Sequence, residues 1–165
     1  MASAAPYWEL TKPGITRLVV LTAAAGFLLG ARGGVDPVLL AHALLGTGLV
    51  AAGTNALNQW WERGADARMG RTRRRPLPAG RLRPGDALAF ATTISIAGIL
   101  WLAAFVNTLT AALAALSLAS YIFAYTPLKR RTPLALFVGA VPGALPILGG
   151  WTAAGAGLTL PGWVL

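Results

Sequence analysis

The longest uncharged stretch of the sequence runs from Ala87 to Leu128 and contains 42 residues. An α-helix rises about 1.5 Å per residue, so a single helix of this length would extend about 63 Å. That is roughly twice the 30 Å hydrocarbon core of a membrane. We therefore expect two membrane-crossing helices here, with a turn near Asn107 and Thr108.

The composition of the whole chain is that of a membrane protein. Its 165 residues are 56% hydrophobic and 12% charged, with a mean hydropathy of +0.63. Soluble domains are about 25% charged, and one of this size has too little interior to hide so much apolar surface. The absence of cysteine excludes disulfides and thiolate metal sites. The N-terminal MASAAPYWELTKPG lacks the features of a signal peptide, so we expect the first apolar segment to be retained.

Other apolar runs predict three more crossings. Ile15 to Ala31 and Pro37 to Trp61 are long enough to span the membrane, and residues 132–165 supply a fifth crossing and the start of a sixth. Helix breakers crowd the fifth crossing: Pro142, Gly143, Pro146, Gly149 and Gly150. Breakers at membrane depth are tolerated where helices pack together or line a cavity. The predicted fold class is all-α, a polytopic transmembrane helical bundle with five complete crossings.

Basic residues alternate between successive connections. The basic segments are the N-terminus with Lys12 and Arg17, residues 63–83 with eight arginines, and residues 129–131. The connections between them carry no excess of positive charge. Because cytoplasmic loops are enriched in lysine and arginine, this alternation predicts a cytoplasmic N-terminus. The simplest explanation of the arginines is that they fix the topology and contact anionic membrane lipid.

The stretch NQWWERGADARMGRTRRRPLPAGR, residues 58–81, also contains carboxylates, which a topology signal does not need. Asn58, Glu62 and Asp66 are spaced at four-residue intervals and share one face of a helix. We expect Gly64 to loosen this helix, which would put Asp66 in the following loop. One amide and two carboxylates are hard oxygen ligands that suit Mg²⁺ bound to a substrate phosphate. The alternative is simple pairing of the two acids with nearby arginines.

Cations from three segments are expected to gather near these oxygens. Arg71 and Arg75 carry planar guanidinium groups that match phosphate. Lys12 and Lys129 lie at the ends of other predicted helices on the same side of the membrane, so both can reach the same phosphate in a helical bundle. Taken singly, either lysine is equally explained as an anchoring charge.

Several stretches resemble the UbiA-type membrane prenyltransferases. The stretch of residues 58–81 resembles their first acidic motif, and LTKPGITRLVVLTAAAGFLLG agrees near the start. YTPLKRRTP at 125–133 and FVGAVPGALPILGGW at 137–151 are most similar to the branch that farnesylates haem. The resemblance implies a UbiA-like helical bundle around a cavity open to the membrane. It also implies transfer of farnesyl from farnesyl diphosphate to a vinyl group of haem b, giving haem O.

The resemblance also assigns roles to residues. It places the first acidic motif on Asn58, Glu62 and Asp66, with Glu62 standing where many relatives have aspartate. Arg71, Arg75, Lys129 and Lys12 are assigned to the diphosphate. Tyr125 is a candidate for facing the allyl or haem group, although an interfacial aromatic role is favoured. The one histidine, His42, is a weaker candidate for a haem ligand.

The resemblance covers nearly the whole chain, but the second acidic motif of the family is absent. We expect residues 1–165 to form one transmembrane prenyltransferase domain, truncated on its C-terminal side. Whether this half is active by itself is left open. The implied partners are Mg²⁺, farnesyl diphosphate, haem b as substrate, membrane lipid, and haem A synthase or a separate C-terminal half. No nucleic acid is expected, and the location is the bacterial inner membrane. The alternatives are prenylation of an aromatic or quinone precursor, and a non-catalytic membrane fragment.

Overall fold

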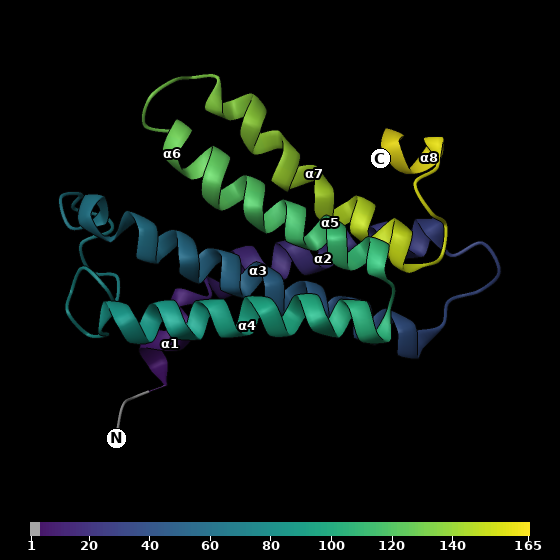
Figure 1. Ribbon diagram of the computed structural model, residues 1–165, viewed down its shortest axis with the longest axis horizontal. Helices are drawn as coiled ribbons and strands as arrows, with labels where there is room; N and C mark the ends of the chain where they lie inside the picture. Colours follow the sequence, from purple (N-terminus) through teal and green to yellow (C-terminus); the bar gives the residue numbers. More distant parts are fainter. Residues whose placement is uncertain (1–3) are drawn as a thin grey trace.

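The computed structural model describes residues 4–165, and these form an elongated bundle of helices (Figure 1). The first three residues of the predicted 1–165 domain lie outside the described part. No β-strand occurs among residues 4–165. The helices are α1 (Ala5–Leu10), α2 (Pro13–Gly30), α3 (Pro37–Asp66), α4 (Pro84–Phe105), α5 (Thr108–Ala119), α6 (Thr126–Leu128), α7 (Ala135–Ala153) and α8 (Leu160–Val164), with a π-helical segment, Ser120–Tyr125, between α5 and α6.

Five helical segments among the described residues are long and apolar enough to cross a membrane. They are α2, α3, α4, the continuous run from α5 to α6, and α7. This confirms the five predicted crossings. The predicted turn near Asn107 is also confirmed, because α4 ends at Phe105 and the Asn107 side chain caps α5 by accepting from the Thr110 amide at 2.7 Å.

The second crossing is longer than the sequence predicted. Helix α3 has 30 residues and a length of about 45 Å, so it projects beyond a bilayer core of about 30 Å. The expectation that Gly64 loosens the helix and puts Asp66 in a loop is wrong. Side chains satisfy the last carbonyl groups instead: Thr72 Oγ1 donates to the Asp66 carbonyl at 2.9 Å and Arg68 Nε to that of Gly64 at 3.3 Å.

Glycines bring the helices close together. Gly26 of α2 lies against the carbonyl oxygen of Ile147, and Gly150 of α7 lies against that of Ala23. A side chain at either position would collide with backbone. The helices α2 and α7 therefore cross in direct backbone contact. Elsewhere on α7, Gly139 contacts the ring of Tyr125, while a methyl group at Gly143 would meet nothing within 4 Å.

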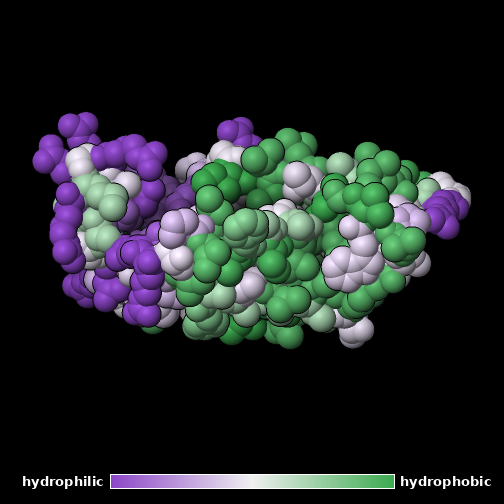
Figure 2. Space-filling model, turned by 90° about the horizontal axis from the view of Figure 1, so that it is seen from above, coloured by the Kyte–Doolittle hydropathy of each residue, from purple (hydrophilic) through white to green (hydrophobic). Residues whose placement is uncertain are grey.

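One end of the bundle is strongly polar. The start of α2, the end of α3, the loop of residues 67–83 and the loop of residues 129–134 all lie there (Figure 1). Figure 2 shows hydrophilic residues gathered at this end, a hydrophobic surface over most of the remaining face, and a small hydrophilic patch at the opposite end. This distribution suits a bundle that spans a membrane and holds its polar residues at one interface.

Candidate functional site at the polar end of the bundle

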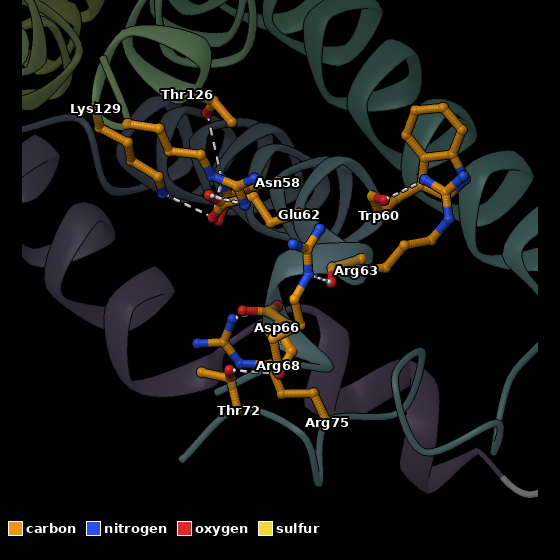
Figure 3. A network of polar contacts seen from close by, with 12 residues as sticks. Asn58, Trp60, Glu62, Arg63, Asp66, Arg68, Thr72, Arg75, Thr126 and Lys129 are labelled. Atoms are coloured by element: carbon orange, nitrogen blue, oxygen red, sulfur yellow. Dashed lines mark hydrogen bonds and ion pairs between the residues drawn. The ribbon is translucent and has the colours of Figure 1, made fainter. Parts of the chain in front are cut away.

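Three oxygen-bearing side chains lie on one face of the last turns of α3. Asn58 is 1% exposed, Glu62 7% and Asp66 5%. Burying a carboxylate is costly unless it is paired and hydrogen-bonded. The surroundings must therefore supply cations and donors, and Figure 3 shows that they do.

Glu62 is paired from the loop that follows α6. Lys129 Nζ donates to Glu62 Oε2 at 2.7 Å, and Arg130 donates to Oε1 at 3.3 Å. Asn58 Nδ2 also donates to Oε2, at 3.1 Å, and reaches Thr126 Oγ1 at 3.3 Å. These bonds tie the end of α3 to the end of the fourth crossing.

Asp66 is paired from the loop of residues 67–83. Arg75 donates to Asp66 Oδ2 at 2.7 Å, and the side chain of Arg75 is 29% exposed. Trp60 and Arg63 point away from this group in Figure 3, and the guanidinium of Arg63 lies over the Trp60 ring at 4.7 Å. Arg75 of the loop thus pairs with the site, whereas Arg63 of α3 faces away from it.

Lys12 enters from the segment before α2. Its Nζ atom donates to Asn58 Oδ1 at 3.0 Å. Burial lowers the pKa of Lys12 to about 8, and the positive charges of Arg75 and Lys129 add to this effect against the opposing influence of Glu62 and Asp66. An additional anion beside Lys12 would raise its pKa again.

A polar pocket of about 350 Å³ lies between these segments. Its charged lining residues are Lys12, Arg71, Arg75, Lys129, Arg130, Glu62 and Asp66. Five cations minus two carboxylates leave an excess of three positive charges when Lys12 is protonated. All the predicted diphosphate ligands therefore line one pocket, and its charge favours a multiply charged anion.

An apolar cavity of about 250 Å³ lies next to the polar pocket. Its walls come from four of the crossings, with residues such as Ile15 of α2, Val50 of α3 and Leu113 of α5. The predicted helix breakers of α7 also line it: Pro142, Gly143, Pro146 and Gly149. Tyr121 lines both the cavity and the pocket, so its side chain marks their junction.

Comparison with known proteins identifies the family. Residues 19–165 match the UbiA prenyltransferase family. The chain belongs to the UbiA prenyltransferase family. It is accordingly a multi-pass integral membrane protein, as its five apolar helices indicate.

The relatives of this UbiA member carry a common description. It is 49% identical to the protohaem IX farnesyltransferase of Solibacter usitatus over 96% of this chain and 58% of that protein. The Sorangium cellulosum protein of the same name is 53% identical over 81% of this chain and 48% of its own length. The chain thus spans about half the length of these relatives.

A solved structure of a digeranylgeranylglyceryl phosphate synthase has the same fold. It matches 93% of this chain with a TM-score of 0.83 and 20% identity, and the match covers 54% of that protein. At this identity the likeness concerns the fold alone. It confirms the predicted UbiA-like bundle.

The oxygens of this UbiA member fit a metal shared with a phosphate ligand. Among residues 4–165 no group of three or more His, Cys, Asp or Glu side chains is placed to hold a metal by itself. Glu62 and Asp66 provide two carboxylates at the edge of a cationic pocket. Mg²⁺ is commonly held by one or two carboxylates together with substrate phosphates and water. The donor set therefore suits a divalent ion of this kind, which UbiA prenyltransferases generally use.

Neither of the two weaker candidates is among the residues that line the polar pocket or the apolar cavity. The Tyr125 ring contacts Gly139 and lies 5.5 Å from Lys129 Nζ. His42 stacks on Phe105 with ring centroids 4.9 Å apart. It precedes Asn58 by 16 residues on α3, or about 24 Å along the helix. Their predicted roles stay predictions.

Sequence reasoning missed three residues that complete the site. Tyr121 and Thr126 belong to the fourth crossing, where a π-helical segment changes the usual helical spacing. Arg130 was assigned only to topology, although it contacts Glu62. The signal for Thr126 was its place between Tyr125 and Lys129, both of which were already candidates.

Proposed function

We propose that the protein is a protohaem IX farnesyltransferase that joins the farnesyl group of farnesyl diphosphate to a vinyl group of haem b, giving haem O. The observation that carries the proposal is the junction of a cationic pocket with an apolar cavity. An allylic diphosphate has the matching halves, a charged headgroup and a hydrocarbon tail. The names of the relatives support haem b as the acceptor.

The cations of the pocket bind and stabilise the leaving group. When the C1–O bond of farnesyl diphosphate breaks, the electron pair leaves with the pyrophosphate. Arg71, Arg75 and Lys129 stabilise this growing negative charge in a site with little water. Glu62 and Asp66 would hold Mg²⁺, which supplies further charge neutralisation at the phosphate oxygens when bound.

The apolar cavity receives the hydrocarbon chain. Because Tyr121 lines both the pocket and the cavity, the first carbon of a farnesyl group that occupies both would lie near its side chain. The Tyr121 ring then faces the positive charge that develops on the allylic carbon, and aromatic rings attract cations. Apolar walls on the other sides keep water from this carbon until the vinyl group attacks. The new bond leaves a positive charge on the vinyl carbon next to the porphyrin ring; water adds to this carbon and loses a proton, which gives the hydroxyl group of haem O.

The same proposal covers the location and partners of the protein. Bacterial relatives and the distribution of charge favour the inner membrane with the polar end of the bundle in the cytoplasm. The exposed arginines of the loop contact anionic lipid there. The remaining proposed partner is haem A synthase, as the user of the product, or a separate C-terminal half.

The test is product formation in membranes that contain the full chain. Membranes are supplied with haem b, farnesyl diphosphate and Mg²⁺, and the pigments are separated by chromatography with mass detection. Haem O should form, and Glu62→Gln and Asp66→Asn should each abolish it. Prenylation of an aromatic acid but not of haem would assign the protein to another branch of the family. Haem O formation that survives both substitutions would contradict the assigned site.

A further inference from the structure

The backbone of Lys12 has an unusual conformation. Its φ of 46° and ψ of 68° lie in the left-handed region, and it is the one non-glycine residue with positive φ among residues 4–165. It also precedes Pro13, which restricts its backbone further. A lysine in this region is strained, and the conformation persists only where neighbouring contacts enforce it.

Gln59 supplies such a contact. Its Nε2 atom donates to the carbonyl oxygens of Glu9 and Leu10, each at 3.1 Å. These are the last two residues of α1, and the Glu9 carbonyl also accepts from the Lys12 amide at 3.2 Å. The path of the chain immediately before Lys12 is therefore fixed to α3.

The buried side-chain amide of Gln59 forms hydrogen bonds through its nitrogen. The residue is 2% exposed, and its Oε1 atom has no hydrogen-bond partner among the described residues. A primary amide has two N–H donors, and here both are used on two carbonyls. Gln59 therefore acts on α1 through its two donors.

Asn58, the residue next to Gln59, binds the ammonium group of Lys12. Asn58 Oδ1 accepts from Lys12 Nζ at 3.0 Å and faces the polar pocket. Neighbouring residues on a helix point about 100° apart, so Asn58 faces the pocket while Gln59 faces α1. We infer that Gln59 is a positioning residue that holds the backbone before Lys12 and so keeps the Lys12 ammonium in the pocket. This inference rests on the proposed function, because it assumes that the pocket binds a diphosphate.

A second contact to α1 provides a matched control. Arg81 forms an ion pair with Glu9, but both side chains are more than 40% exposed. Exposed ion pairs contribute little to stability. Arg81→Gln should therefore leave Lys12 in place, although it removes an interaction from the same helix that Gln59 contacts.

The experiment measures binding of inorganic pyrophosphate with Mg²⁺ to the detergent-solubilised full chain, by calorimetry at about pH 7. The variants are Lys12→Gln, Gln59→Leu, their double variant, and Arg81→Gln. Lys12→Gln and Gln59→Leu should each weaken binding about tenfold. The double variant should be within about twofold of either single one, because both changes remove the same contact. Arg81→Gln should bind pyrophosphate as tightly as the unsubstituted chain does.

The outcomes separate the inference from the proposed function. No pyrophosphate binding by the unsubstituted chain would overturn both. Normal binding by the unsubstituted chain together with an unchanged affinity in Gln59→Leu, or with losses that multiply in the double variant, would overturn the positioning role alone. If Gln59→Leu does not fold, Gln59→Met keeps the length of the side chain without its donors and replaces it. An equal loss of affinity in Arg81→Gln would mean that any loosening of α1 is sufficient, which also contradicts a specific role for Gln59.

Discussion

Lys129 Nζ lies 2.7 Å from Glu62 Oε2, although the two residues are 67 positions apart in the sequence. The contact joins the cytoplasmic ends proposed for the second and fourth crossings. Both residues line the polar pocket, and the Glu62 side chain is only 9% exposed. A carboxylate and an ammonium group are thus held together in the pocket that we propose for the anionic headgroup of the substrate.

The two carboxylates of the pocket should be required for binding in the presence of metal. Glu62→Gln and Asp66→Asn keep the shape of each side chain but remove a charged oxygen ligand. Each should lower the affinity for farnesyl diphosphate in Mg²⁺ by at least about tenfold, measured by calorimetry. Asp86→Asn is the control, because Asp86 is exposed at the start of α4. Equal losses in all three variants would contradict a local role for Glu62 and Asp66.

The charge of Arg75 should set the pH at which Lys12 titrates. The pKa of Lys12 is lowered to about 8 by burial first and by the positive charge of Arg75 next. Removing that charge in Arg75→Gln favours protonated Lys12, so the pH above which pyrophosphate affinity falls should move upward. The overall affinity should also drop, because a phosphate ligand is lost. Arg74→Gln removes an exposed neighbour and should leave the pH dependence where it was; a downward shift in Arg75→Gln would refute the argument.

The close crossing of α2 and α7 should not tolerate a methyl group. In Gly26→Ala the added carbon collides with the backbone carbonyl of Ile147, which cannot rotate away. We expect the free energy of unfolding to fall by about 2 kcal/mol or more, measured by unfolding in detergent. Gly14→Ala lies on the same helix with nothing within 4 Å of the new carbon, so it should be neutral or stabilising by up to about 1 kcal/mol. Similar stabilities for the two variants would show that the helices are not in contact there.

The ring of Tyr121 should matter for the reaction rather than for binding. Tyr121→Leu removes the aromatic face at the junction of pocket and cavity, whereas Tyr121→Phe keeps it. We expect kcat for haem O formation to fall at least about tenfold in the leucine variant, with KM for farnesyl diphosphate little changed. The phenylalanine variant should stay close to the wild type. Phe123→Leu, on a residue that is 68% exposed, controls for loss of an aromatic ring from the same helix; an equal loss there would contradict the role of Tyr121.

Much of the fold follows from the sequence because membrane crossings have a fixed length. The uncharged run of residues 87–128 is too long for one helix and too apolar for a loop, so its division at Asn107 was predictable. The end of α3 at Asp66 could not be predicted in this way. A glycine such as Gly64 destabilises a helix, so the sequence favours an earlier end. The side chains of Thr72 and Arg68, which extend the helix to Asp66, act through a loop whose path the local sequence does not specify.

The candidate site, like the fold, could be predicted from the sequence only in part. The four-residue spacing of Asn58, Glu62 and Asp66 predicts a shared helix face, and helix geometry alone is sufficient for that. The approach of Lys129 and Lys12 to these residues depends on how three crossings pack. The sequence predicts only that both lysines lie on the same side of the membrane. The π-helical segment that brings Tyr121 to the junction has no signature in the residue pattern.

The most direct test of the central claim is a calorimetric titration of the full chain with farnesyl diphosphate, before and after chelation of divalent metal. The claim is that Glu62 and Asp66 bind the diphosphate through a metal ion, with the cations of the pocket assisting. Chelation should weaken binding at least about tenfold, and added Mg²⁺ should restore it. Binding that is equally tight with and without the chelator would contradict the account.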